Sequence, residues 1–470
     1  MAVTDTRPDR AGGLEGFFHL RERGTDVRTE VIAGLATWLT MAYILVVNPA
    51  ILSSLPDSNG TSLPFDQLVT VTALAAGVLT IAMGIFTNYP FAMAAGLGLN
   101  AFVAFTLVGA AGLTWEQAMG VIVIEGLVIA ALVLTGFREA VLNAIPMDLK
   151  RAIGIGIGLF IAFIGLSIDA PIVTREGPTI LALDPEYITS LRGLTFFVGF
   201  ALTAALVARR IKGALLIGII GTTVLASIIN AFVDVSPWPP GVATLPDKIA
   251  ATPDFGLIGQ FSFGVFTAET IGFATALALI ISVMLSDFFD TMGTVIGVGG
   301  EAKLLTADGK LPGVQRVLFV DSLGAALGGA TSSSSNTTYI ESAAGVSEGG
   351  RTGLTAVVVG ILFLLAMFLA PLPGVVPSEA TAPVLVIVGY FMMGIVKDID
   401  WRDPGIGIPA LLTMIVMPFT FSITNGVGAG FVAYTVIQVL RGRWKEVHWL
   451  MYLVSAIFVW YFVEGLVPLG

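Results

Sequence analysis

The sequence predicts an all-helical membrane protein that crosses the bilayer many times. Of its 470 residues, 56% are hydrophobic and only 12% are charged, whereas a soluble domain has about 25% charged residues. The mean hydropathy is +0.91, and apolar stretches of about 20 residues, the length of a spanning helix, recur along the chain. The chain lacks the short alternating strands that are typical of a transmembrane barrel. A helix bundle therefore remains as the fold that pairs every backbone amide within the membrane.

Composition also excludes several kinds of chemistry. The chain has no cysteine, which excludes disulfides, thiolate metal sites and cysteine nucleophiles. Its two histidines, His19 and His448, lie beside charged flanking segments, so proton chemistry inside the membrane falls to Asp, Glu, Tyr or Lys. The net charge of −10 argues against a nucleic-acid partner. Without a Walker motif, ATP-driven pumping is not expected either, and we expect no cofactor and no metal ion.

Fourteen or fifteen apolar segments follow one another between residues 30 and 466. The last of them, 446–466, is predicted to be an interfacial helix, with a fifteenth span as the alternative. Lys and Arg gather in the linkers on one side, for example Lys150, Arg151, Arg209, Arg210, Lys212 and Arg351. By the positive-inside rule, this asymmetry predicts that the N-terminus is cytoplasmic. The protein is expected to lie in the cell membrane. The polar segment 1–29 lacks a signal-peptide cleavage site, so the first apolar segment is expected to remain as a membrane helix.

Two unusually short apolar segments indicate an internal repeat. Segments 96–110 and 338–346 are too short to span as helices, and each is the third in its half of the chain. The long loop 233–264 divides the halves, with seven segments on either side. Paired interruptions of this kind are typical of transporters built from inverted repeats, whose substrate site lies at the broken helices.

The first broken segment reads "NYPFAMAAGLGLNAFVAF", residues 88–105. Pro90, Gly96 and Gly98 suit an extended segment followed by a half-helix. Asn100 would lie in the first turn of that half-helix, where its amide can both donate to and accept from a ligand. The structural alternative is that the two glycines allow tight helix packing and that Asn100 satisfies freed backbone groups.

The second broken segment reads "TSSSSNTTYIESAAGVSEGGRTG", residues 331–353. Its hydroxyl side chains, including Thr337 and Thr338, can satisfy an extended backbone. Thr338 and Glu341 also have the spacing of a capping box, which would give the glutamate a structural role. A carboxylate at membrane depth nevertheless costs at least about 2.5 kcal/mol, and a helix N-terminus lowers that cost and suits a polar ligand. We therefore favour ligand binding for Glu341.

Two aspartates lie within the apolar stretch "LALIISVMLSDFFDTMGTVIGVG". Asp287 and Asp290 are three residues apart, so a helix places them on one face. Two such carboxylates in a low dielectric resist double ionisation, so one is expected to bind a proton near neutral pH, as a proton-coupled carrier requires. Phe288 between them is a candidate for stacking on a planar ligand, with core packing as the alternative. The structural alternative for the aspartates is bonding to nearby hydroxyls, those of Ser286, Thr291 and Thr294.

Two further acids lie within apolar segments. Glu125, in "VIVIEGLVIA", has no partner nearby in the sequence, so both a coupling and a structural role stay open. Asp321, in "LFVDSLGAALGG", is on a glycine-rich helix, which favours a structural network.

Five blocks of the chain closely resemble the AzgA-like purine permeases, carriers of hypoxanthine, adenine and guanine related to the nucleobase/ascorbate transporters. The blocks are "VRTEVIAGLATWLTMAYILVVNPAIL", "AAGLGLNAFVAF", "SDFFDTMGTVIGV", "DGKLPGVQRVLFVDS" and "NTTYIESAAGVSEGGRTGLTAVVVG". They occur in order between about residue 17 and at least residue 400. Five linked blocks are far more specific than any single motif.

The resemblance implies a fold of the uracil-permease type. In that fold, fourteen helices form two inverted repeats of seven, and helices three and ten are each preceded by a short strand. A core domain of helices one to four and eight to eleven moves against a gate domain of the remaining helices. The implied division of this chain is a cytoplasmic segment 1–29, core domain 30–136 and 265–371, and gate domain 137–264 and 372–470.

The resemblance also implies a substrate site between core and gate. The family's third-helix asparagine falls on Asn100, its eighth-helix aspartates on Asp287 and Asp290, and its tenth-helix glutamate on Glu341. Related permeases are often dimers, so the resemblance allows a homodimer.

The sequence therefore predicts an importer of purine nucleobases by proton symport with alternating access. Asp287 and Glu341 would bind the base, and Asp290 or Glu341 would carry the proton. The alternatives are a sulfate or dicarboxylate exchanger, a uracil or xanthine carrier on the same fold, and a channel. Acids at the half-helices disfavour anions, and paired broken helices favour a carrier over a channel. An intramembrane aspartyl protease is not expected, because its second aspartate motif is absent.

Overall fold

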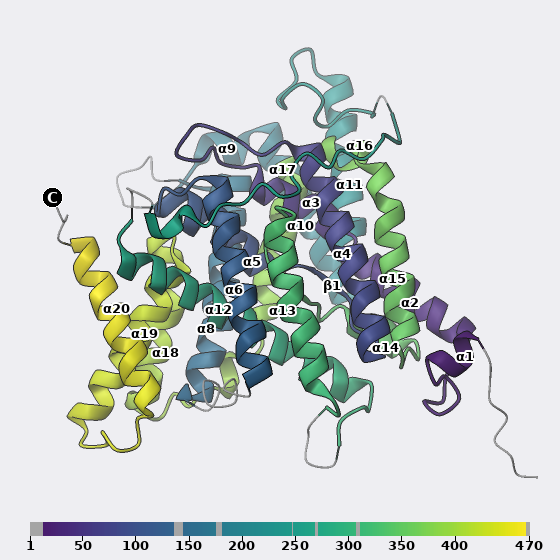
Figure 1. The fold of residues 1–470 in the computed structure, drawn as a ribbon. Helices are drawn as coiled ribbons and strands as arrows, with labels where there is room; N and C mark the ends of the chain where they lie inside the picture. Colours follow the sequence, from purple (N-terminus) through teal and green to yellow (C-terminus); the bar gives the residue numbers. More distant parts are fainter. Residues whose placement is uncertain are drawn as a thin grey trace, which may run out of the picture.

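The computed structural model describes residues 13–135, 144–174, 181–246, 248–267, 271–306 and 311–466. Over these residues the chain is a bundle of helices with two small two-stranded sheets (Figure 1). Within them, nine helical stretches are long and apolar enough to cross a membrane, and four shorter apolar helices accompany them. The predicted all-helical, polytopic fold is confirmed, and the number of fourteen spans stays a prediction.

The elements of the first half run from α1 to α11. In order they are α1 (Leu14–Phe17), α2 (Val27–Met41), α3 (Ile44–Leu52), α4 (Phe65–Thr87), β1 (Met93–Ala95), α5 (Leu97–Ala101), η1 (Phe102–Ala110), α6 (Trp115–Thr135), α8 (Met147–Ile164), η2 (Gly165–Asp169), β2 (Val173–Thr174), β3 (Ala182–Leu183), α9 (Pro185–Thr189), α10 (Leu191–Ala208) and α11 (Ala214–Phe232).

The second half runs from η3 to α20. In order the elements are η3 (Gly264–Thr267), α12 (Phe273–Glu301), α13 (Val314–Ala330), β4 (Asn336–Thr338), α14 (Ser342–Ser347), α15 (Gly353–Ala366), η4 (Met367–Leu369), α16 (Pro371–Gly374), α17 (Ser378–Met393), η5 (Val396–Asp398), α18 (Pro404–Thr420), α19 (Ile423–Leu440) and α20 (Trp449–Leu466).

The helices pack as two groups. In the first helix group, α15 lies along α4 and α2, and α13 lies along α6 and α4. In the second helix group, α8 packs on α17 and α18, α18 on α19, and α10 on α11 and α17. The long helix α12 contacts α6 of the first group and α19 and α20 beyond it. Figure 1 shows α18, α19 and α20 together at one side of the molecule and α1, α2 and α15 at the other.

The two broken segments meet at the centre of the bundle. Strand β1 pairs antiparallel with β4, so that Met93 faces Thr338 and Ala95 faces Asn336. All six strand residues are buried, and the pairing satisfies backbone groups that an unwound helix would otherwise leave without partners. A short strand before each broken helix was predicted, and both strands are present.

The last helix, α20, packs along one of its faces against other helices of the protein. α20 contacts α12 and α19, and its apolar part, Trp449–Val463, is shorter than the nine long stretches of the described chain. Its interfacial position stays a prediction.

Candidate functional site

The first broken segment places Asn100 deep in the protein. Gly96 precedes α5, and its N–H donates to the carbonyl of Ser335 at 3.0 Å. Asn100 is fully buried, and neither its Nδ2 nor its Oδ1 has a hydrogen-bond partner in the described chain. A buried amide without partners costs free energy, so the interpretation that Asn100 satisfies freed backbone groups is wrong here.

The two glycines of this segment allow close packing. A Cβ on Gly98 would lie 2.5 Å from Cγ2 of Ile157, and a Cβ on Gly96 would lie 3.0 Å from Cγ2 of Thr337. The first distance is too short for a real Cβ contact and the second is tighter than most, so the packing role proposed for these glycines holds. The absence of a Cβ at these two positions allows α5 to pack closely against α8 and against the second broken segment.

The second broken segment is held by Asp321 of α13. The N–H of Thr338 donates to Oδ1 of Asp321 at 2.9 Å, and the hydroxyl of Thr291 donates to Oδ2 at 2.6 Å. The Thr291 and Thr337 hydroxyls lie 2.6 Å apart. Asp321 thus ties β4 to α12 and α13, which is the structural network predicted for it.

Glu341 does not form the capping box that was its structural alternative. It lies directly before α14, with helical backbone angles and no side-chain cap, and the Thr338 hydroxyl is buried without a partner. The fourth residue of the expected box is therefore outside the helix rather than in its first turn. Instead, the hydroxyl of Tyr43, between α2 and α3, donates to Oε1 of Glu341 at 2.7 Å.

Asp287 lies against Glu125 rather than against hydroxyl groups. Both side chains are buried, with 1% and 0% of their surface exposed, and the two acids are close neighbours where α6 contacts α12. Neither oxygen of Asp287 receives a hydrogen bond from an amide or hydroxyl of the described chain. The Thr291 hydroxyl bonds to Asp321, and that of Ser286 donates to the carbonyl of Ser282 at 2.9 Å. The hydroxyl-bonded alternative for Asp287 is therefore wrong.

Gly126, next to Glu125, allows α6 to lie close to α13. A Cβ on Gly126 would lie 2.3 Å from the amide nitrogen of Ala326 and 2.7 Å from the carbonyl oxygen of Ser322. The backbones of α6 and α13 are therefore in direct contact beside Glu125. The hydroxyl of Ser335, from the second broken segment, donates to Oε2 of Glu125 at 3.4 Å.

Asp290 has a different environment from Asp287, although the two share α12. Asp290 is surrounded by protein on several sides, with Asp321 and Glu341 as its acidic neighbours, yet solvent reaches its side chain. Gly293 and Gly297, further along the same helix, are exposed as well. Phe288 is buried, with 6% of its surface exposed. Asp287 thus lies near α6 and α13, whereas Asp290 lies at an exposed position of the same helix.

Five acids together form what we call the acidic cluster: Glu125, Asp287, Asp290, Asp321 and Glu341. They come from α6, α12, α13 and the residue before α14. Within the described residues, no group of three or more His, Cys, Asp or Glu has a geometry suited to a metal ion. The cluster is suited to binding N–H donors and protons.

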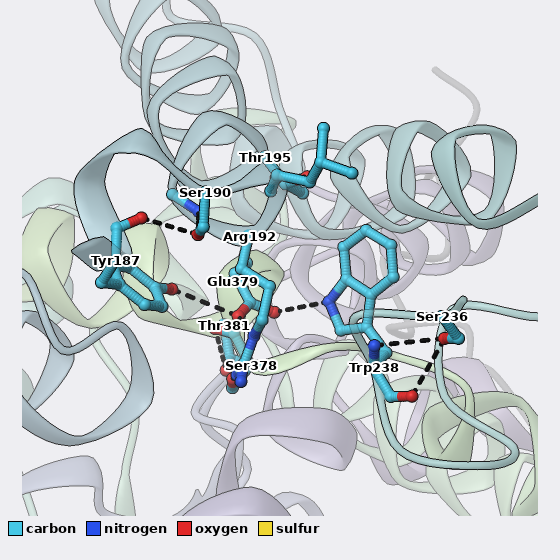
Figure 2. Close-up of polar contacts among 11 residues, drawn as sticks. Tyr187, Ser190, Arg192, Thr195, Ser236, Trp238, Ser378, Glu379 and Thr381 are labelled. Atoms are coloured by element: carbon cyan, nitrogen blue, oxygen red, sulfur yellow. Dashed lines mark hydrogen bonds and ion pairs between the residues drawn. The ribbon is translucent and has the colours of Figure 1, made fainter. Parts of the chain in front are cut away.

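A second buried carboxylate, Glu379 at the start of α17, has all the partners that Asp287 lacks. The indole Nε1 of Trp238 donates to Oε2 of Glu379 at 2.9 Å, and the hydroxyl of Tyr187 donates to Oε1 at 3.2 Å. The Arg192 guanidinium forms an ion pair with the same carboxylate. Figure 2 shows Tyr187 and Trp238 reaching Glu379 from opposite sides, with the Arg192 side chain between them. Sequence reasoning assigned no role to Glu379.

Glu30 of α2 is another buried carboxylate, and sequence reasoning missed it. Its Oε1 accepts from the N–H of Arg351 at 2.8 Å, and its Oε2 accepts from the N–H and the hydroxyl of Thr355 at 3.1 and 2.6 Å. Glu30 therefore caps the N-terminus of α15 from a helix distant in sequence. The sequence did contain a signal for this role, because Glu30 is an acidic residue in the first turn of an apolar helix.

Comparison with known proteins finds relatives that match this chain over nearly its whole length. The chain is 40% identical over 456 residues to "Adenine permease AdeQ" of Escherichia coli (strain K12), covering 97% of each protein. It is 40% identical over 459 residues to "Guanine/hypoxanthine permease PbuG" of Bacillus subtilis (strain 168), covering 96% of this chain and 99% of that one.

Among solved structures, the transmembrane domain of the cyanobacterial bicarbonate transporter BicA has a similar fold. Its TM-score is 0.61 at 13% identity, with 86% of this chain and 97% of that chain covered. Identity this low shows the fold alone. The sequence profile of the Permease family (Xan_ur_permease) matches residues 28–429. With that match and relatives at 40% identity over nearly the whole length, the chain belongs to the Permease family.

Proposed function

We propose that this protein is a secondary active transporter that imports purine nucleobases, namely adenine, guanine or hypoxanthine, together with protons. The observation that carries the proposal is a set of buried polar atoms of the described chain without partners, on the first broken helix and on α12. They are both amide atoms of Asn100 and both carboxylate oxygens of Asp287. The names of AdeQ and PbuG, adenine and guanine/hypoxanthine permeases, support purines as the substrate class.

The chemistry of these atoms fits the edge of a purine. A purine presents ring and amino N–H donors beside ring-nitrogen and carbonyl acceptors. A carboxylate only accepts, whereas an amide both donates and accepts. We assign Asp287 and Glu341 to the N–H donors of the base and Asn100 to its mixed edge, with Phe288 as a flanking ring. The alternative is a bicarbonate-like or sulfate-like anion, as the BicA fold suggests, but a site with five acids disfavours an anion.

Alternating access would follow from the two helix groups. We assign the first helix group to a core domain, 30–136 and 265–371, and the second to a gate domain, 137–264 and 372–470. The broken segments belong to the core, and α12 faces both groups. Movement of the core against the gate would open the site to each side in turn. Fourteen spans in two inverted repeats, a cytoplasmic N-terminus in the cell membrane and a homodimer belong to the same proposal.

Uptake by purified protein in liposomes tests this function. Labelled adenine, guanine, hypoxanthine, uracil and bicarbonate are offered with and without an inward proton gradient. Saturable purine uptake that the gradient drives above the external concentration is expected, together with purine counterflow, which distinguishes a carrier from a channel. Transport of bicarbonate without purine uptake would instead assign an anion transporter.

A further inference from the structure

Tyr43 occupies one of the two carboxylate oxygens of Glu341. Its hydroxyl donates to Oε1 at 2.7 Å, and among the side chains that the structure describes no other donates to this carboxylate. Tyr43 is only 1% exposed, whereas Glu341 is partly exposed. Because a carboxylate accepts hydrogen bonds through two oxygens, Oε2 is the oxygen of Glu341 that remains for a ligand.

The packing of the surrounding elements holds this contact in place. Tyr43 lies in the turn between α2 and α3, and the hydroxyl of Thr40 donates to the backbone carbonyl of Glu341 at 3.5 Å. Helix α14 begins directly after Glu341 and packs on α2. A Cβ on Gly345 of α14 would lie 2.3 Å from Oγ1 of Thr37, so the two helices are in direct contact. Tyr43 and Glu341 therefore belong to one packed unit of the first helix group.

The two acids that we assign to the base differ in what they offer it. Neither oxygen of Asp287 has a hydrogen-bond partner in the described chain, so Asp287 offers two acceptors side by side. Glu341 offers one, because Tyr43 holds the other. Two carboxylate oxygens accept from a pair of parallel N–H donors, as they do from an arginine side chain. A single oxygen suits a single N–H.

The donors of guanine divide in the same way. Its pyrimidine ring carries an N–H beside the 2-amino group, which makes a pair of parallel donors. Its imidazole ring carries one N–H. Hypoxanthine has both ring N–H groups but lacks the 2-amino group. The donor pair fits Asp287, and the lone imidazole N–H fits Glu341.

We infer that Tyr43 is a specificity-determining residue that sets the orientation of the bound base, an inference that rests on the proposed function. By holding Oε1 of Glu341, Tyr43 prevents this acid from accepting a pair of donors. The base therefore binds with its pyrimidine edge toward Asp287 and with its imidazole N–H donating to Oε2 of Glu341. Tyr43 acts through Glu341 and is thus a positioning residue.

The base 8-aminohypoxanthine is the probe for this role, because its 8-amino group adds a second donor beside the imidazole N–H. In the wild type, Tyr43 already holds the oxygen that this donor needs, so the probe should bind no more tightly than hypoxanthine. Tyr43→Phe frees Oε1, so the variant should bind the probe about tenfold more tightly than hypoxanthine, the effect of one added hydrogen bond. Competition of each base with labelled hypoxanthine for the purified protein measures both ratios.

Glu341→Gln examines the same assignment from the other edge of the base. The amide keeps one acceptor oxygen but loses the charge, so the affinities for guanine and for hypoxanthine should fall by the same factor. The 2-amino group lies at Asp287 and not at Glu341, so the ratio of the two affinities should stay at its wild-type value. A larger loss for guanine would place the donor pair at Glu341 and overturn the inference.

Tyr187→Phe is the matched control, because Tyr187 is a buried tyrosine of the second helix group that also donates to a buried glutamate, Glu379. Both affinity ratios should keep their wild-type values in this variant, since a loss of stability does not change the ratio of two affinities.

Two outcomes with the probe would overturn the inference and leave the proposed function intact. One is a ratio of probe to hypoxanthine affinity that Tyr43→Phe does not change. The other is tighter binding of the probe than of hypoxanthine by the wild type, a measurement that depends on the folding of no variant. Absence of any purine uptake or binding by the wild type would overturn the proposed function as well.

Discussion

Two buried carboxylates of this protein have opposite surroundings. Glu379 and Asp287 are almost equally buried, at 0% and 1% exposed. Glu379 has a cation and two neutral donors as partners, from α9, α10 and the loop that contains Trp238. Asp287 has another acid, Glu125, and receives no hydrogen bond from any amide or hydroxyl of the described chain.

The difference separates a structural role from a functional one. A buried charge is tolerated when it is paired and hydrogen-bonded, as Glu379 is. Burial of a carboxyl group without hydrogen-bond donors destabilises the folded protein, so folding alone does not explain it. Such unfavourable groups are found most often at ligand sites. Burial of an acid is thus uninformative by itself, whereas the absence of donors around a buried acid points to a ligand.

The largest effect is expected for Asp287→Asn. The amide still accepts one hydrogen bond but loses the charge-assisted bond to the purine N–H, a loss of about 2.7 kcal/mol or about 100-fold in affinity. Thermal stability should not fall, because no hydrogen-bond donor of the described chain depends on this carboxylate. Binding of labelled hypoxanthine in detergent, beside unfolding followed by the fluorescence of the seven tryptophans, measures both properties. Unaltered purine affinity would move the site elsewhere.

Glu379→Gln should show the reverse pattern. Glutamine removes the counter-charge of Arg192, and we expect a loss of about 2 kcal/mol of stability, below the value for a fully buried pair, because the Arg192 side chain is 36% exposed. Purine affinity of the folded fraction should be unchanged. The tryptophan unfolding midpoint reports the loss, with Asp66→Asn, at an exposed acid in the first turn of α4, as the control. A variant as stable as wild type that binds purine poorly would reverse the two assignments.

A smaller, pH-dependent effect is expected for Tyr187→Phe. Burial, and the Glu379 carboxylate beside it, raise the pKa of the Tyr187 hydroxyl. The folded protein therefore holds this proton more tightly than the unfolded chain, so the contribution is complete below about pH 10 and is lost as the pH rises above that value. Phenylalanine should cost about 1 kcal/mol at neutral pH, the value of one hydrogen bond. Unfolding midpoints between pH 8 and pH 11 should fall less steeply in the variant, and parallel curves would contradict this role.

The sequence predicted the elements that depend on local patterns. Apolar segment length, the glycines around Asn100 and the polar run before Glu341 indicated helices, breaks and short strands, and the structure has them. It did not predict partners that depend on packing. Tyr43 is 298 residues from Glu341, and Arg192 is 187 residues from Glu379. Nothing local favours either pair.

The two structural alternatives that the structure rules out fail for the same reason. The spacing of Thr338 and Glu341 fits a capping box, but β4 extends through Thr338 because its backbone pairs with β1, so the helix begins too late for the box. The hydroxyls expected around Asp287 are used by Asp321 and by the backbone of α12. In each case a distant partner competed successfully with a neighbour in the sequence.

The pairing of β1 with β4 has a consequence for biogenesis. Tyr339 donates its hydroxyl to the carbonyl of Ala95, 244 residues earlier in the chain. The first broken segment is therefore synthesised long before the strand that satisfies it, and contacts of such sequence separation form late and slowly. Until the second half is inserted, the backbone of Met93–Ala95 lacks its permanent partner, so the interval between the two insertions is when this protein is most vulnerable to misassembly.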